Sequence, residues 1–276
     1  MSLNTIVDSV CRHINHWRAA HDGCLTVGIC GAQGSGKSTV ADGVGERLEK
    51  LGLAVAKLSL DDLYLAREGR SGLAETVHPL LRTRGVPGTH DVLLGERVLD
   101  GLKRGERLAL PRFDKAQDEP LPVSAWPLVT GPVDVVLFEG WCVGAAPEPE
   151  EALAAPVNDL ERLEDPAGVW RRYVNGMLGG DYQDLFARID RLVFLAAPGF
   201  EVVADWRKQQ EHELRAERLR AGLNWAQVMD DRAVERFVSH YERLTRHMLR
   251  EMPGRADLVL YLDRDRRCLR AKSRSD

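Results

Sequence analysis

The feature that most limits how this chain can fold is a glycine-rich segment between an apolar run and a helical pattern. Residues 28–43 read GICGAQGSGKSTVADG, in which Gly31, Gly36, Lys37 and Ser38 fit the spacing G-x-x-x-x-G-K-[ST]. The apolar run 24–30 predicts a buried strand before the glycines, and a helix is predicted after them, over about 37–51. A strand, a glycine loop and a helix in this order predict a phosphate-binding loop.

Each residue type in this loop has a physical role in holding a phosphate. Glycines let successive backbone N–H groups turn toward one anion, and the start of the following helix adds a positive field. We expect Lys37 to reach the β and γ phosphates of ATP and Ser38 to offer its hydroxyl to Mg²⁺. The expected nucleotide-binding residues are Gly31, Ala32, Gln33, Gly34, Ser35, Gly36, Lys37, Ser38 and Thr39.

Further apolar runs alternate with helical patterns along the chain. Strands are predicted over 53–60, 132–140, 189–197 and 257–263, and helices over 4–19, 91–103, 167–179, 199–221 and 231–251. This alternation predicts an α/β fold of the P-loop NTPase type, with a doubly wound, mostly parallel sheet, helices on both faces and a mobile lid helix. We expect one domain over 1–264, with a leading helix in 1–22, and a frayed, polar and basic tail over 265–276.

Composition narrows the partners that this chain is expected to have. The 276 residues carry 38 basic and 42 acidic side chains, a net charge of −4, which favours neither nucleic acid nor a membrane surface. Five scattered cysteines show no metal-ligand or redox spacing, and we expect reduced thiols in a cytoplasmic protein. The expected partner is a small anionic substrate, while protein partners and the oligomeric state stay open.

Two acidic positions follow predicted strands and suggest a metal and a base. Glu139 ends the run VVLFEG, where it would hold Mg²⁺ or its bound water, although strands often end on an ordinary acid. The segment SLDDLYL places Asp61 just past the second strand, where its carboxylate could take a proton from an acceptor hydroxyl. Asp62 would cap the next helical turn, which is also the plain alternative for Asp61. Tyr64 is expected beside the substrate.

Loops around the same sheet edge carry cations. The segment RGVPGTHD, residues 84–91, predicts a rigid, exposed bend, and LPRFDKAQDEP follows at 110–120. Together the cations of these loops would suit an anionic acceptor, although each side chain taken alone would most simply be exposed to solvent. The acceptor-site candidates from these loops are Arg84, His90, Asp91, Arg112 and Lys115, of which Asp91 most simply begins a helix.

Two later helices complete the candidate site. In the charged helix around 204–220, Arg207 is the leading candidate to stabilise charge as the γ-phosphate leaves, although such helices are often simply solvated. The helix around 237–249 is mainly a packing element, from which Tyr241, Arg243 and Arg246 could face the cleft.

Taken in order, these segments resemble the D-glycerate 3-kinases, relatives of uridine kinase, pantothenate kinase and phosphoribulokinase. The resemblance rests on GAQGSGKST, SLDDLYL, RGVPGTHD, LPRFDKA, VVLFEGWCVG, DWRKQQE and HYERLTR, and it covers roughly residues 24–263. It implies ATP-dependent phosphorylation of D-glycerate to 3-phosphoglycerate, with Asp61 as the base, Lys37 and Ser38 on phosphate and Mg²⁺, and Arg207 in the lid. Arg84, His90, Asp91 and Lys115 fall in segments that resemble acceptor-site segments.

The chain departs from this family in one place. After FDKA, family members tend to carry an Asp-Arg pair, whereas Asp118, Glu119 and Pro120 follow here. If the missing arginine holds the acceptor's carboxylate, Arg112 is the expected substitute, or the acceptor differs. The acceptor loops carry few aromatic residues, which favours a small acid over a nucleoside or pantothenate. A nucleotide-dependent switch or assembly ATPase without an acceptor base is the alternative from another class.

Overall fold

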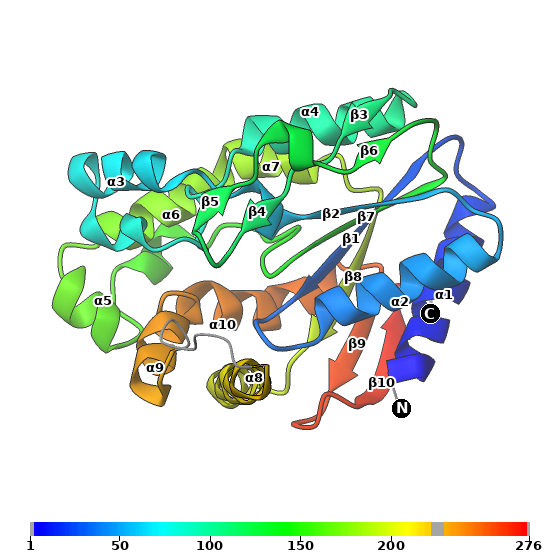
Figure 1. The fold of residues 1–276 in the computed structure, drawn as a ribbon. Helices are drawn as coiled ribbons and strands as arrows, with labels where there is room; N and C mark the ends of the chain where they lie inside the picture. The colour runs from blue at the N-terminus through cyan, green and yellow to red at the C-terminus, as the bar shows by residue number, and fades with distance from the viewer. Residues whose placement is uncertain (1–2, 222–228, 275–276) are drawn as a thin grey trace.

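The computed structural model describes residues 3–221 and 229–274, which form a layered α/β structure (Figure 1). A six-stranded sheet lies at the centre with the order β10-β9-β8-β1-β7-β2, and every pairing is parallel except that of β10 with β9. The sheet strands are β1 (Leu25–Gly31), β2 (Val55–Ser59), β7 (Val135–Gly140), β8 (Arg191–Ala196), β9 (Leu258–Leu262) and β10 (Cys268–Ser273). The predicted α/β class with a mostly parallel sheet is therefore confirmed.

Helices cover both faces of this sheet. The α-helices of the described residues are α1 (Leu3–Arg18), α2 (Lys37–Lys50), α3 (Arg67–Thr76), α4 (Val92–Lys103), α5 (Asp159–Glu164), α6 (Val169–Gly179), α7 (Asp181–Phe186), α8 (Glu201–Arg220), α9 (Asp231–Ser239) and α10 (Glu242–Glu251). Two small antiparallel pairs lie outside the main sheet: β3 (Leu108–Ala109) with β6 (Leu128–Val129), and β4 (Phe113–Asp114) with β5 (Glu119–Pro120).

The core lies in two layers because the central strands are buried on both faces. On one face α1 and α2 pack against the sheet through Ile14, Val44 and Leu48 among others. On the other face α4, α7 and α10 pack on side chains of alternating strand positions, such as Phe138 and Phe194. A continuous apolar run is what a strand covered on both sides requires, and β1 and β7 have it.

Two predictions about chain organisation are wrong. The tail is not frayed over its whole length: β10 pairs with β9, Cys268 is buried at its start, and residues 275–276 lie outside the described part. Sequence reasoning missed this strand because its middle residues are exposed and polar, as an edge strand allows. The helix expected over 231–251 is two helices, α9 and α10, separated at His240 and Tyr241.

No helix within residues 3–221 and 229–274 has the length and apolar character needed to cross a membrane.

Candidate active site

The phosphate-binding loop joins β1 to α2 at the carboxyl edge of the sheet. Gly34 and Gly36 have φ values of 76° and 86°, a left-handed backbone that favours glycine. Gly34 also lies against Trp206 of α8, so closely that an added Cβ would come within 2.6 Å of the tryptophan Cβ. Gly36 caps α2 without a side-chain hydrogen bond, which leaves the N–H groups of the first helical turn available to an anion.

A cluster of side-chain oxygens lies beside the start of α2. Ser38 Oγ donates to Glu139 Oε1 at 3.2 Å, and Ser59 Oγ donates to the same oxygen at 2.7 Å. The second oxygen of Glu139, Oε2, is buried and has no hydrogen-bond partner among the described residues. The strand register explains why Ser59 and Glu139 are in contact, because β7 pairs with β2 so that Glu139 lies opposite Ser59. Carboxylate and hydroxyl oxygens are ligands that Mg²⁺ accepts, and the orphaned oxygen fits such an ion.

Asp61 lies directly after β2 and is held by two hydrogen bonds. Lys115 Nζ donates to Oδ2 at 2.5 Å, and the Tyr64 hydroxyl donates to Oδ1 at 2.8 Å. Burial alone would raise the pKa of this carboxyl, but the ammonium groups of Lys115 and Lys37 and the two hydrogen bonds outweigh it. The pKa of Asp61 is held well below its usual range, so the carboxylate is ionised at neutral pH.

Lys115 reaches Asp61 because the β4–β5 hairpin is tied down on both sides. Asp114 Oδ1 accepts the backbone N–H groups of Ala116 and Gln117 at 2.8 and 3.1 Å, which closes a tight turn around Lys115. Asp62 Oδ1 accepts the N–H of Phe113 at 3.1 Å and anchors β4. Asp62 therefore does not cap a helical turn as predicted; Ser59 does so, by accepting the N–H of Asp61.

A small cavity of about 80 Å³ opens between the phosphate loop and these segments. Four cations line it against the single carboxylate of Asp61, which makes it an anion-attracting site. Its lining residues are Gln33, Lys37, Asp61, Tyr64, Arg84, Lys115, Trp141, Arg207, Phe237 and Tyr241.

Arg84 is fixed at this cavity by an acidic partner. Its Nη1 donates to Asp118 Oδ1 at 2.5 Å, and its guanidinium lies 5.8 Å from the centre of the Phe113 ring. Asp118 also pairs with Arg70, a side chain only 2% exposed, whose Nη2 lies 2.7 Å from Oδ2. The φ of Asp118 is 59°, an uncommon value outside glycine, and the two arginines hold it there. Asp118 thus holds Arg84, the one of its arginine partners that lines the cavity.

Arg207 projects from α8 into the same cavity. Its Nη2 pairs with Glu211 one turn along the helix, and its guanidinium lies 5.5 Å from the centre of the Phe237 ring. The Nε atom is buried without a hydrogen-bond partner in the described part of the chain. The structure therefore brings Lys37, Asp61, Tyr64, Arg84, Lys115 and Arg207, all predicted from the sequence, to one place.

The bend at residues 84–91 is buried rather than exposed, which changes the interpretation of two candidates. A β-bridge joins His90 to Tyr64, and the two rings stack with centroids 4.6 Å apart. The Tyr182 hydroxyl lies 2.6 Å from His90 Nδ1. Burial lowers the pKa of His90 to about 3, so it is neutral and supports Tyr64 instead of supplying a cation. Asp91 accepts the N–H of Leu94 as the N-cap of α4 and does not line the cavity.

The buried His90 predicts a dependence of stability on pH. The unfolded imidazole takes up a proton near its ordinary pKa of 6.5, whereas the folded one resists it down to about 3. The unfolded state therefore binds more protons as pH falls below 6.5, and the free energy of unfolding decreases by about 1.4 kcal/mol per pH unit from this group. Urea unfolding between pH 7 and 5 should show a shallower decrease for His90→Asn than for the wild type. The exposed His16→Asn is the control, and equal slopes in His90→Asn and wild type would contradict the prediction.

Arg112, the expected substitute for the missing arginine, is not among the residues that line the cavity. Its Nη1 lies 3.4 Å from Asp62 Oδ2 and donates to the carbonyl of Pro111 at 2.7 Å. The side chain thus packs behind the β4–β5 hairpin.

Some residues around the site escaped the sequence analysis. Arg266 donates from Nε to the carbonyl of Gly34 and stacks on Trp206, so the turn before β10 supports the phosphate loop. The Trp206 indole N–H donates to the carbonyl of Arg264 at 2.7 Å. These contacts join positions more than 50 residues apart, and no local pattern indicates them.

The α10 candidates divide into three environments. Tyr241, which immediately precedes the helix, lines the cavity and donates to the carbonyl of Arg84 at 3.1 Å. Arg243 is buried in ion pairs with Glu148 and Glu161, and Arg246 lines a different groove.

The chain is similar to known kinases in sequence and in structure. No family model matches the chain. An uncharacterized kinase of Schizosaccharomyces pombe is 36% identical over 254 residues, which cover 87% of this chain and 86% of that protein. A solved structure of D-glycerate 3-kinase from Cryptococcus neoformans superimposes with a TM-score of 0.80 at 29% identity, covering 97% of this chain and 98% of the other. The chloroplastic D-glycerate 3-kinase of Arabidopsis thaliana is 30% identical over 257 residues.

The chain belongs to the D-glycerate 3-kinase family.

This membership agrees with the resemblance seen in the sequence and with the P-loop architecture of the sheet. The match spans 87% of this chain but about half, 52%, of the Arabidopsis protein. In this chain Arg84 and Lys115 both line the cavity, and Asp118 is the partner that holds Arg84.

Proposed function

We propose that this chain transfers the γ-phosphoryl group of Mg·ATP to the 3-hydroxyl of D-glycerate, giving 3-phosphoglycerate and ADP. The observation that carries the proposal is the cavity that joins Lys37 of the phosphate loop to the ionised Asp61 and to Arg84 and Lys115. Its four cations suit an anionic acceptor such as a small acid.

Each residue has a role that follows from its place. The acceptor hydroxyl donates to a carboxylate oxygen of Asp61, and its oxygen attacks the γ-phosphorus as the bond to the β–γ bridging oxygen breaks. Asp61 receives the proton, and ADP leaves with the electron pair of the broken bond. The low pKa of Asp61 suits this step, because phosphoryl transfer needs positioning and charge stabilisation more than a strong base. Lys37 and Arg207 hold the transferred group and its developing charge.

Mg²⁺ fits beside Ser38 and Glu139, where the buried Oε2 of Glu139 is without a protein partner among the described residues. When bound there, Mg²⁺ would neutralise part of the phosphate charge. Ser59 would keep the other Glu139 oxygen occupied and its carboxylate in place.

Arg84 and Lys115 are proposed to bind the acceptor's carboxylate. Arg84→Ala removes one charge-assisted contact, worth about 1.5–3 kcal/mol, and should raise the KM for D-glycerate about 10- to 100-fold. The KM for ATP should change little, since Arg84 lies on the acceptor side. Arg112→Ala is the matched control, because its guanidinium is outside the cavity. Steady-state kinetics in both substrates measure this, and an unchanged KM for D-glycerate in Arg84→Ala would remove it from the site.

The experiment that tests the function itself is ADP release with Mg·ATP in the presence of D-glycerate, L-glycerate, uridine or pantothenate. Uridine is included because aromatic side chains could stack on its base. Four of them line the cavity: Tyr64, Trp141, Phe237 and Tyr241. We expect stimulation by D-glycerate, with the 3-phosphate identified by NMR. Stimulation by uridine or pantothenate instead would change the acceptor, and steady hydrolysis that no acceptor stimulates would indicate a switch ATPase.

A further inference from the structure

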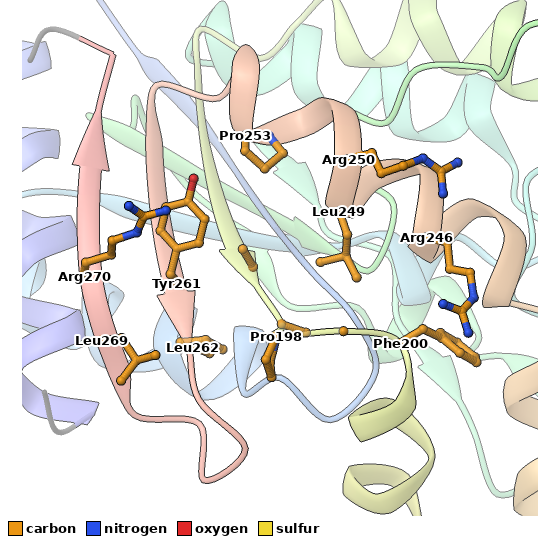
Figure 2. Close-up of a pocket in the computed structure, with 13 residues that line it drawn as sticks. Pro198, Phe200, Arg246, Leu249, Arg250, Pro253, Tyr261, Leu262, Leu269 and Arg270 are labelled. Carbon is orange, nitrogen blue, oxygen red and sulfur yellow. The ribbon is translucent and has the colours of Figure 1, made fainter.

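A groove of about 620 Å³ lies outside the active-site cavity, between α10 and the last strands of the sheet (Figure 2). Its residues come from α10, from β9 and β10, and from the segment that leads out of β8, and none of them lines the cavity around Asp61. Its volume falls in the range of roughly 300–1,000 Å³ that is typical of small-molecule sites.

The charge of this groove has one sign. Arg246, Arg250 and Arg270 line it, and no acidic residue does. Figure 2 shows Arg246 and Arg250 extending from α10 on one side of the hollow and Arg270 on β10 on the other. Apolar side chains lie between them, among them Leu249 and Pro198. Cations on two sides of an apolar floor are complementary to a molecule with a charged group and an apolar body.

Two of these arginines are held by aromatic rings. The guanidinium of Arg270 lies 4.0 Å from the centre of the Tyr261 ring, and that of Arg246 lies 5.2 Å from the centre of the Phe200 ring. Stacking fixes the face of a guanidinium and leaves its N–H edge for an anion.

The arginines differ in how far protein acids already engage them. Arg246 pairs with Glu201 and Glu242, and Arg250, with a side chain 64% exposed, lies 3.4 Å from Glu148. Around Arg270, no carboxylate of residues 3–221 or 229–274 is within ion-pair distance. Arg270 is therefore the strongest candidate to bind an outside anion.

We propose that this groove binds a phosphate monoester with a planar apolar body. The phosphate would contact Arg270, whose donors are the least engaged, and the ring would lie on the apolar floor, which includes Leu249 and Pro198. An inorganic anion alone would leave the apolar floor in water, and a neutral ring alone would leave Arg270 without an anionic partner. Both parts of the ligand are needed, and this distinguishes the site from a surface that merely attracts anions.

The test uses 1-naphthyl phosphate as the probe and isothermal titration calorimetry as the readout. Saturating Mg·ADP keeps the phosphate loop occupied, so binding elsewhere is measured. We expect one site, with inorganic phosphate and neutral 1-naphthol each binding at least tenfold more weakly. Equal affinity for inorganic phosphate would show an adventitious anion site and overturn the proposal. The measurement does not depend on which acceptor the enzyme phosphorylates, so its failure would leave the proposed function intact.

Variants then locate the probe. Arg270→Ala should weaken binding at least fivefold, Arg250→Ala on the other side of the hollow should weaken it less, and Arg12→Ala on the exposed side of α1 should leave it unchanged. All three should keep the acceptor-stimulated release of ADP, which shows that they fold. Unchanged affinity in Arg270→Ala would overturn the proposal. So would a dimer, detected by sedimentation velocity, that Arg270→Ala dissociates, because the groove would then belong to an interface between two copies.

Discussion

Asp61→Asn is expected to lower kcat by about 10²- to 10⁴-fold while leaving the affinity for ATP nearly unchanged. The substitution keeps the shape of the side chain but removes the proton acceptor and the charge that faces Lys115 and Lys37. Coupled ADP release measures kcat, and calorimetric titration with a non-hydrolysable ATP analogue measures nucleotide affinity. The two measurements separate loss of catalysis from loss of binding, which a single activity assay does not.

The neighbouring carboxylate supplies the matched control. Asp62 lies one residue away, but it accepts the backbone N–H of Phe113 and pairs with Arg112, outside the cavity. Asp62→Asn should therefore cost some stability and much less activity than Asp61→Asn, as thermal unfolding and kcat together would show. The reverse result, with Asp62→Asn inactive and Asp61→Asn active, would make Asp62 the base and overturn this assignment.

The main sheet was predictable from sequence because its strands are buried on both faces. Such strands are short apolar runs, and five of the six were predicted within a few residues of their observed bounds. The sixth, β10, lies at the edge, where only Cys268 and Ser273 are buried and the middle residues are exposed. Its sequence carries little apolar signal, and its pairing with β9 becomes visible only in three dimensions.

The sequence predicted the site residues that belong to a motif or directly follow a strand. It did not predict which loop side chains are buried. The phosphate loop and Asp61 follow strands, and parallel strands bring their carboxyl ends to one edge. His90 and Arg112 were misjudged because both sit in polar, turn-rich segments that resemble exposed loops. The β-bridge to Tyr64 keeps His90 buried. The contact with Asp62 holds the side chain of Arg112 away from the cavity. The ion pair between Arg84 and Asp118 spans 34 residues and likewise has no local signature.

Lys37→Ala is expected to reduce kcat by about 10³-fold or more, the largest effect of a single substitution in the phosphate loop. Lys37 begins α2 and lines the cavity that also holds Asp61, so its ammonium group can contact both the transferred phosphate and the acceptor side. Alanine is a good helix former, and α2 should keep its fold. Lys50→Ala, at the exposed far end of the same helix, is the control for removal of one positive charge.

The result also decides between a kinase and a protein that merely binds nucleotide. If Lys37 acts on the transferred phosphoryl group, Lys37→Ala should lose far more in kcat than in affinity for ADP, because the γ-phosphate is absent from ADP. Acceptor-stimulated ADP release and ADP titration give the two quantities, with unchanged thermal unfolding as evidence of folding. Full activity in Lys37→Ala would remove the loop from the chemistry. An equal loss in both quantities would give Lys37 a role in holding nucleotide rather than in the transfer step.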